Sequence, residues 1–179
     1  NERISHECYG PNGVSRILSE EGKIVDIVNN YARMSFNVGP TLLSWLEQKE
    51  PEVYQAILEA DKLSLSLFDG HGSAIAQVYN HIIMPLAKRA DKETQVKWGI
   101  YDFEMRFGRA PKGMWLAETA VDTETLEVLA ENGIDYTILA PYQGTAFRKI
   151  GDETWTEGID TRKPYVCKLP SGKSINLFF

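Results

Sequence analysis

The sequence has few cysteines and none of the spacings that mark a disulfide or zinc framework. Its two cysteines, Cys8 and Cys167, lie far apart and form no CxxC pair. A stapled secreted domain and a zinc knuckle are therefore not indicated. Reduced thiols are typical of the cytosol, and we expect a cytoplasmic protein.

Basic residues are not in excess, and long hydrophobic runs are missing. Lys and Arg number 19 against 25 Asp and Glu, a formal net charge of −6. A chain without a basic excess is poorly suited to neutralise a phosphate backbone, so we expect no nucleic-acid partner. No run approaches the roughly 20 apolar residues that cross a bilayer, so we expect no membrane partner either.

What the sequence does contain is the composition of a globular domain. Its 179 residues are 43% hydrophobic and 25% charged. This composition suffices for a single domain, residues 1–179, with a hydrophobic core. The chain starts at Asn1 rather than Met and ends in the apolar run 174–179. We therefore expect a fragment in which Phe178 and Phe179 lie at an open sheet edge.

Helix and strand signals alternate along the chain. Apolar spacing with Pro, Asp and Gly boundaries predicts helices over 11–21, 40–49, from Pro51 onward, over 91–106 and after Asp122. Short apolar runs predict strands over 32–37, 73–78, 113–116 and 135–140, and a hairpin over 165–179. This alternation predicts an α/β fold whose parallel sheet, open or closed into a barrel, carries helices on its outside.

A carboxylate follows the apolar strand over 113–116. Glu118 stands just before a helix that Asp122 is expected to cap. Parallel α/β folds place their active sites at the carboxyl ends of their strands, so Glu118 is a candidate catalytic residue. The alternative is an acid near a helix N-terminus that only interacts with the helix dipole. Other helical acids, Glu127 among them, are expected to face solvent.

Several motifs in order resemble a known family. Trp115-Leu116-Ala117-Glu118 is preceded by a Phe-Glu-x-Arg-Phe-Gly-Arg-x-Pro motif at 103–111. It is followed at 127–141 by a second motif, Glu-x-Leu-Ala-x-x-Gly-Ile-x-Tyr-Thr-Ile-Leu-Ala-Pro. Further likenesses cover 27–31, 35–43 and 72–86. Together they resemble glycoside hydrolase family 57, whose members act on α-glucans. The resemblance covers residues 6–143.

The resemblance implies a retaining enzyme on an incomplete seven-stranded (β/α) barrel, here truncated at both ends. Glu118 matches the family's nucleophile, while the family's acid/base Asp lies in a later segment and is not identifiable in this chain. The family's N-terminal His-Gln-Pro motif is absent as well. The implied partner is an α-linked oligo- or polysaccharide, acted on by hydrolysis, glucanotransfer or branching, without metal or organic cofactor. The isolated chain is expected to be inactive.

Trp115 and two histidines are candidate substrate-binding residues. Strand alternation puts Trp115 and Ala117 on one face and Leu116 and Glu118 on the other, so Trp115 either stacks on sugar or belongs to the core. His71 and His81 are expected in the sugar cleft, with His81 bonding hydroxyls or a neighbouring carboxylate. A purely structural role is the alternative for His81.

Two other functions stay open at this stage. Asp69, His71 and His81 raise the possibility of a metal-dependent polysaccharide deacetylase. Their spacing is poor for this, because the two histidines are ten positions apart rather than at the i, i+4 separation that puts two ligands on one helical face. We therefore predict no metal site. The non-enzymatic alternative is a carbohydrate-binding homologue without catalysis.

Overall fold

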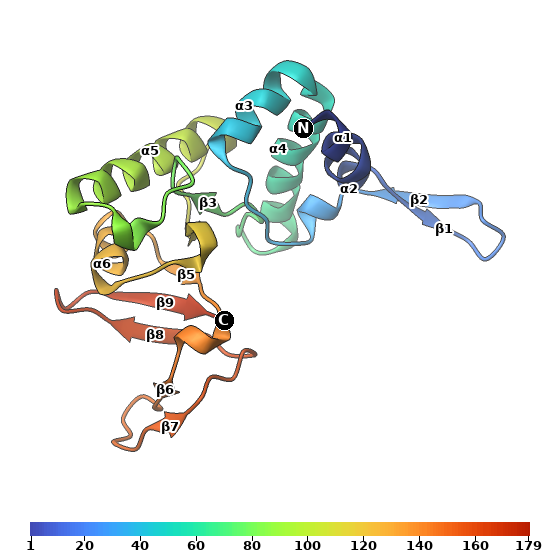
Figure 1. The fold of residues 1–179 in the computed structure, drawn as a ribbon. Coiled ribbons are helices and arrows are strands. Elements are labelled where there is room, and N and C mark those ends of the chain that lie inside the picture. The colour runs from blue at the N-terminus through green and yellow to red at the C-terminus, as the bar shows by residue number, and fades with distance from the viewer. The chain divides into compact units, whose positions relative to one another are not determined.

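The computed structural model describes all of residues 1–179 and divides them into two compact units. Unit 1 consists of Asn1–Ile75 and Phe103–Arg109, and unit 2 consists of Ala76–Asp102 and Ala110–Phe179. Figure 1 follows the chain from the N-terminal helices to the C-terminal strands. Each unit is described by itself.

Unit 1 is mainly helical. Its longer helices are α3 (Pro40–Lys49) and α4 (Pro51–Leu67). Both begin at a proline, whose fixed φ and missing N–H suit the first turn of a helix. They confirm the helices predicted to start at these two positions. The shorter helical segments are α1 (Glu2–Ile4), the π-helical turn η1 (Ser5–Tyr9), α2 (Gly10–Gly13) and the 3-10 turn η2 (Asn30–Ala32).

A β-hairpin replaces the helix predicted over 11–21. Strands β1 (Ser15–Leu18) and β2 (Ile24–Val28) pair antiparallel and project from the helices of unit 1 (Figure 1). Gly22, with φ of 76°, closes the turn, and the amide of Ser19 donates to the carbonyl of Lys23 at 2.8 Å. The prediction was wrong because this local turn and the cross-strand pairing outweigh the helical spacing of a few apolar residues.

The strand predicted over 32–37 is reduced to a single bridge. Phe36 pairs parallel with Ala74, while Ala32 belongs to the turn η2 and residues 33–35 form no strand. Asn29 caps this turn by accepting a hydrogen bond from the amide of Tyr31 at 3.1 Å. A side-chain cap of this kind favours a turn over an extended strand.

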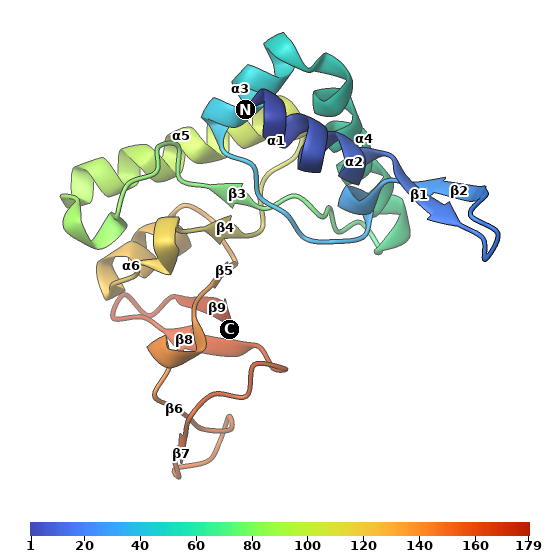
Figure 2. The same cartoon turned by 45° about the vertical axis from the view of Figure 1, so that its right-hand side comes forward.

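Unit 2 contains a set of short, mostly parallel strands. β3 (Ala76–Gln77) pairs parallel with β4 (Met114–Trp115), and Gly113 makes a parallel bridge to Tyr136 at the start of β5 (Tyr136–Ile138). Figure 2 shows β3, β4 and β5 beside one another. These strands confirm the predicted α/β class, and each lies within a predicted strand but is shorter than predicted.

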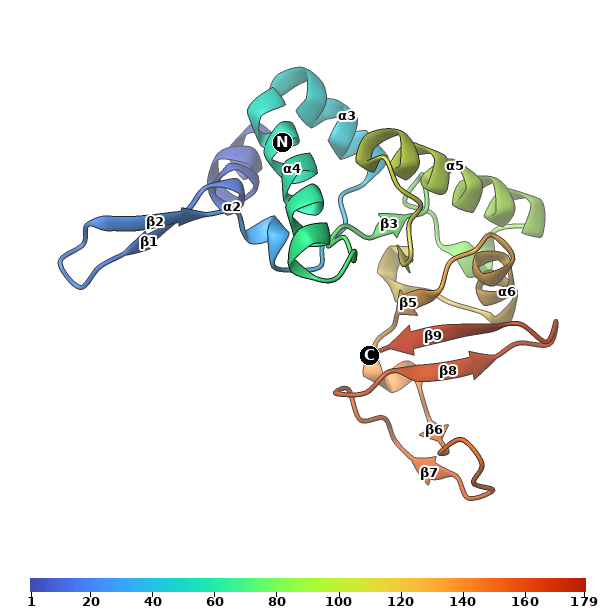
Figure 3. The same cartoon turned by 180° about the vertical axis from the view of Figure 1, so that it is seen from behind.

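The last strand lies inside its sheet rather than at an edge. β9 (Ser174–Phe178) pairs parallel with β5 on one side and antiparallel with β8 (Tyr165–Lys168) on the other (Figure 3). The predicted β8–β9 hairpin is confirmed. The expected open edge at Phe178 and Phe179 is wrong, because both neighbours of β9 lie within this chain. Phe178 contacts the Tyr136 ring edge-on, with centroids 5.3 Å apart.

Helices and turns of unit 2 pack against these strands. The helices are α5 (Arg89–Phe107), whose last turn belongs to unit 1, and α6 (Thr123–Glu131). Gly99 lets α5 approach β3, since a Cβ there would lie 2.2 Å from the carbonyl oxygen of Gln77. No helix is both long enough and apolar enough for a membrane crossing. The remaining elements are the 3-10 turns η3 (Met84–Leu86), η4 (Ala117–Thr119) and η5 (Pro141–Gln143) and the short strands β6 (Ala146–Phe147) and β7 (Thr156–Glu157).

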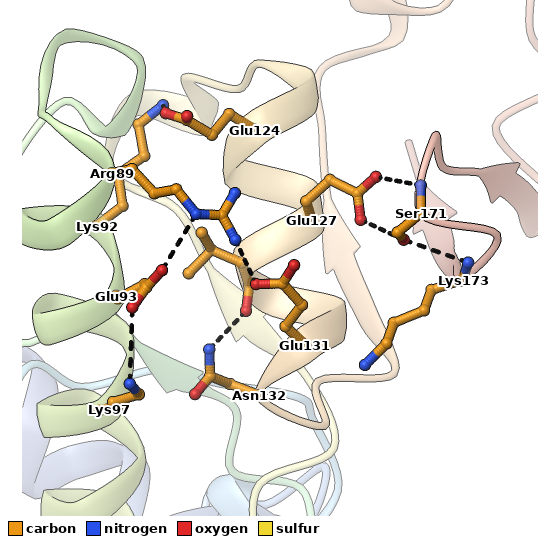
Figure 4. A network of polar contacts seen from close by, with 11 residues as sticks. Arg89, Lys92, Glu93, Lys97, Glu124, Glu127, Glu131, Asn132, Ser171 and Lys173 are labelled. Atoms are coloured by element: carbon orange, nitrogen blue, oxygen red, sulfur yellow. Dashed lines mark hydrogen bonds and ion pairs between the residues drawn. The ribbon is translucent and has the colours of Figure 1, made fainter.

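Charged residues connect α5, α6 and the β8–β9 turn, as Figure 4 shows. Arg89 on α5 bonds both Glu93 and, on α6, Glu131. Glu127, expected to face solvent, is instead nearly buried and accepts hydrogen bonds from the amide and hydroxyl of Ser171. These bonds hold the pKa of Glu127 below its ordinary value. The helical spacing of the sequence could not predict the burial of Glu127, because its partner Ser171 is 44 positions away.

Candidate functional site

Polar side chains gather where three neighbouring strands of unit 2 end. His81 follows β3, Glu118 follows β4, and Gln143 follows β5. Because β3, β4 and β5 run parallel, their carboxyl ends share one edge of the sheet. Trp115, the last residue of β4, completes this set. These four residues are called the strand-end cluster below.

Glu118 and His81 are in direct contact. The His81 Nε2 and Glu118 Oε1 atoms lie 3.1 Å apart, within hydrogen-bond distance. Both side chains remain open to solvent, at 59% exposure for His81 and 69% for Glu118. The contact therefore orients the carboxylate without burying it. The sequence placed both residues near a site, and the structure brings them together.

Trp115 lies next to the same histidine. Its ring centroid is 6.0 Å from that of His81, with the two planes tilted by 46°. The side chain is half-buried, whereas its neighbours Met114 and Leu116 are fully buried. Trp115 therefore combines the two alternatives, core packing and sugar stacking, since part of the residue packs inside and part stays accessible.

The expected alternation of faces ends before Glu118. Leu116 and Glu118 were expected on one face, but Leu116 is fully buried and Glu118 is exposed. The strand stops at Trp115, and Ala117–Thr119 form the 3-10 turn η4. A period of two holds only in extended backbone, so it does not predict where Glu118 points.

Glu118 and Thr119 both adopt left-handed backbone conformations, with φ of 57° and 53°. Such a conformation costs a non-glycine residue about 1–2 kcal/mol. Two backbone hydrogen bonds close the turn, from Thr119 N to the carbonyl of Leu116 and from Ala120 N to that of Ala117, each at 3.0 Å. Strain of this kind persists where surrounding contacts hold it, and it concentrates at functional sites.

Gln143 supports this turn from the neighbouring strand end. Its Nε2 donates to the carbonyl oxygen of Thr119 at 2.9 Å, and its Oε1 accepts from the amide of Ala140 at 2.7 Å. Sequence reasoning missed this residue. The available signal was a glutamine three positions after Ala140, the spacing at which a Gln side chain bonds back to the residue that precedes a helical turn.

Lys92 holds the segment that follows Glu118. Its side chain is 1% exposed, and its Nζ lies 2.8 Å from Asp122 Oδ2 and 2.9 Å from Glu124 Oε2. Burial lowers the Lys92 pKa, but hydrogen bonds to the two carboxylates outweigh this and leave the pKa raised. Burial likewise raises the Asp122 pKa, and the bonds from Lys92 and Thr125 bring it below its ordinary value. Sequence reasoning missed Lys92, because a lysine on an amphipathic helix normally faces water.

Asp122 is the helix cap that the sequence predicted. Its Oδ1 accepts from the amide of Thr125 at 2.7 Å at the start of α6. The same carboxylate thus serves the helix N-terminus with one oxygen and Lys92 with the other. This anchors the chain four residues beyond Glu118.

The other predicted residues lie outside the strand-end cluster. His71 is exposed in the loop after α4 in unit 1, and Asp69 in the same loop has φ of 50°. No three His, Cys, Asp or Glu side chains come together in a way that could hold a metal ion. Two surface hollows of the structure, of about 510 and 650 Å³, are lined by other residues than the cluster. The one carboxylate of the cluster, that of Glu118, is open to solvent.

Comparison with known proteins gives a family match over nearly the whole chain. The model of "Glycosyl hydrolase family 57" matches residues 7–179. Alpha-amylase 1 of Dictyoglomus thermophilum is 34% identical over 101 residues, which cover 55% of this chain and 13% of that protein. The 4-alpha-glucanotransferase of Thermococcus litoralis is 25% identical over 124 residues, covering 66% and 17%.

A solved structure shares the fold. The crystal structure of 4-alpha-glucanotransferase from Thermococcus litoralis aligns with a TM-score of 0.58 and 23% identity, over 83% of this chain and 22% of that one. The chain thus matches less than a quarter of the length of the amylase and of the glucanotransferase.

Proposed function

Because this chain belongs to glycosyl hydrolase family 57, we propose that it supplies the nucleophile of an enzyme that cleaves or transfers α-linked glucans. The observation that carries the proposal is the Glu118 carboxylate, exposed at the carboxyl end of β4 and hydrogen-bonded to His81. The names of the amylase and the glucanotransferase among its relatives support the substrate class. A (β/α) barrel-like catalytic domain is the fold that this family membership favours.

In the proposed reaction, Glu118 attacks the anomeric carbon of a glucose unit. The bond from that carbon to the leaving oxygen breaks while a bond to Glu118 Oε forms, and a covalent glycosyl-enzyme results. Water then releases the sugar in a hydrolase, whereas a sugar hydroxyl takes it over in a glucanotransferase or branching enzyme. Both outcomes use the same carboxylate, so the proposal covers both.

His81 and Trp115 have separate roles in this proposal. A hydrogen bond from His81 Nε2–H fixes one Glu118 oxygen and leaves the other free for attack. The accessible part of Trp115 offers an aromatic face on which the C–H groups of a pyranose ring can pack. His71 stays a candidate for binding glucan, because of its place in the loop that the sequence assigns to the sugar cleft.

Retaining hydrolysis requires a second carboxyl group about 5–5.5 Å from the nucleophile, which protonates the leaving oxygen and later activates water. Glu118 is the single carboxylate of the strand-end cluster. The family resemblance assigns the second role to an Asp in a later segment. Glu118 alone can form the sugar bond, but efficient turnover needs that second group.

The proposal is tested by Glu118→Gln in the full-length protein. The amide keeps the size of the side chain and one oxygen that can accept from His81, but it is not a nucleophile, so glucan turnover should fall by about a thousandfold or more. Turnover is measured as release of reducing ends or as transfer products from maltooligosaccharides. Glu20→Gln, at an exposed position in the hairpin turn of unit 1, is the matched control and should keep full activity.

Three further readouts separate the alternatives: covalent labelling, sensitivity to EDTA and binding of maltooligosaccharides. A fluorinated α-glucosyl fluoride should add one glycosyl mass to the peptide that contains Glu118, and not to that of Glu118→Gln. A loss of less than tenfold in Glu118→Gln would remove the nucleophile role. Activity abolished by EDTA would instead favour a metal-dependent deacetylase, and maltooligosaccharide binding without any turnover would favour a non-catalytic homologue.

A further inference from the structure

We propose that Gln143 is a positioning residue for Glu118. Its side-chain amide holds the carbonyl group of Thr119 and so keeps the left-handed turn in the conformation that directs the Glu118 carboxylate toward His81. The inference rests on the proposed function of Glu118, and it deepens it by naming what maintains the geometry of the nucleophile.

The amide of Gln143 is used at both ends, which fixes its orientation. Its Oε1 accepts from the backbone N–H of Ala140, a group that can only donate, at 2.7 Å. Its Nε2 donates to the carbonyl oxygen of Thr119, a group that can only accept, at 2.9 Å. The backbone amide of Gln143 also donates to the carbonyl of Ala140, so the 3-10 turn holds the side chain in place. The link from β5 to the Glu118 turn is therefore a defined bridge.

Glutamine is the side chain that meets this double requirement at this length. Glutamate keeps the acceptor for Ala140 but, when ionised, has no proton to donate to Thr119. Methionine fills a similar space without either bond, and asparagine is one methylene shorter. Substitutions at position 143 can therefore distinguish the effect of the N–H donor from the effect of side-chain size.

The turn needs such support because two consecutive non-glycine residues in it are left-handed. The Thr119 carbonyl belongs to the peptide plane that directly follows this pair of residues. A hydrogen bond that holds this plane therefore restrains the ψ angle of Thr119. Downstream, Asp122 is anchored by Lys92 and by the start of α6. Upstream of Asp122, the side chain of Gln143 holds the turn itself through the carbonyl group of Thr119.

The first test compares kcat and KM for Gln143→Met and Gln143→Asn in the full-length protein. Small displacements of a reacting group mainly reduce the chemical step, so kcat should fall about 10- to 100-fold while KM stays within about twofold. Gln55→Met is the matched control, because Gln55 is an exposed residue of α4 that bonds only its helical neighbour Glu59. It should keep the wild-type kcat.

The second test uses pH. In Gln143→Glu, the introduced carboxyl group is ionised at pH 7 and repels the Thr119 carbonyl, but when it takes up a proton near pH 4.5 it can donate in place of the amide. The ratio of kcat for Gln143→Glu to kcat for Gln143→Met should therefore rise about threefold or more from pH 7 to pH 4.5. A role in bulk packing alone predicts a flat ratio.

The third test does not depend on activity. Amide hydrogen exchange over 116–122 should be about tenfold faster in Gln143→Met than in the wild type, and unchanged in Gln55→Met. Unchanged exchange, a kcat within twofold of wild type, or a flat pH ratio would each overturn the inference. If Glu118→Gln stays active while exchange at 116–122 still responds to Gln143, the nucleophile proposal fails and the restraint on the turn stands.

Discussion

At the scale of single residues, the contact between His81 and Glu118 decides how the carboxylate is presented. Between exposed groups, water screens a contact of this kind, so it contributes only about 0–1 kcal/mol to stability. Here it joins residues that are 37 positions apart and follow different strands. Both side chains stay exposed, so the bond orients Glu118 and leaves it accessible. His81 is therefore expected to affect the reaction rather than the stability of unit 2.

We predict that His81→Ala lowers kcat/KM on maltooligosaccharides about 10- to 100-fold, because Glu118 loses the contact that orients its carboxylate for attack. His81→Gln should recover much of the loss, since its amide can donate to the same Glu118 oxygen. His6→Ala, at an exposed position in unit 1, is the control. Equal losses in His81→Ala and His81→Gln would show that the bond to Glu118 is not the important feature.

At the scale of elements, α5 and α6 are joined by a buried cation between two carboxylates. Lys92 extends from α5, and Asp122 and Glu124 stand at the start of α6. A buried ammonium group is tolerated only when it is paired and hydrogen-bonded. The pair also connects the cap of α6 with the segment that carries Glu118. The attachment of this helix should therefore depend on pH.

The sign of this pH dependence follows from the two pKa shifts. The folded pKa of Asp122 lies below 3.8, so its stabilising effect is present above pH 3.8 and is lost as pH falls through the folded pKa. The folded pKa of Lys92 lies above 10.5, so its effect is present below pH 10.5 and is lost as pH rises through the folded pKa. Urea unfolding should show an excess stability of the wild type over Lys92→Met that is level from about pH 5 to 9 and smaller at both extremes.

Lys97→Met serves as the control for this series. Lys97 lies on the same helix, is 60% exposed and pairs with Glu93 at 3.7 Å. An exposed pair contributes about 0–1 kcal/mol. A wild-type advantage over Lys92→Met that stays the same at pH 3 and pH 7 would contradict the assigned pairing.

At the scale of the whole molecule, unit 1 is built from two segments that are distant in sequence. Residues 103–109 return to it after the chain has passed through part of unit 2. Arg109 attaches this returning segment, donating to both carboxylate oxygens of Asp61 at 2.8 Å and to the carbonyl of Ala74 at 2.9 Å. Asp61 is 1% exposed, and its guanidinium partner lies over the Phe103 ring. Unit 1 therefore depends on a buried ion pair.

We predict that Arg109→Met destabilises unit 1 by about 3–5 kcal/mol, because it leaves the Asp61 carboxylate buried without its cation. Hydrogen exchange in α4 should become faster to a matching degree. Arg16→Met, at an exposed position in the β1–β2 hairpin, should change stability by less than about 0.5 kcal/mol. A loss in Arg109→Met no larger than in Arg16→Met would refute the role of the ion pair.

The sequence by itself determined the α/β class, the helices that begin at Pro40 and Pro51, the cap at Asp122, the β8–β9 hairpin and the family. These features depend on local periodicity, on the special backbone of Pro and Gly, and on motifs read in order, all of which are contained in short stretches of chain. The same stretches contained Trp115 and Glu118 as candidates.

Tertiary structure alone decided how the candidates meet. The partners of Glu118, Lys92 and Glu127 come from positions 30 to 44 residues away, and no local period can encode such a pairing. The hairpin at β1–β2 and the central place of β9 likewise depend on cross-strand hydrogen bonds that outweigh local preference. The left-handed turn at Glu118 is held by the side chain of Gln143, from 24 positions away. Backbone strain and buried charge are stable only where distant contacts hold them, and that is why these features appear in the fold and not in the local pattern.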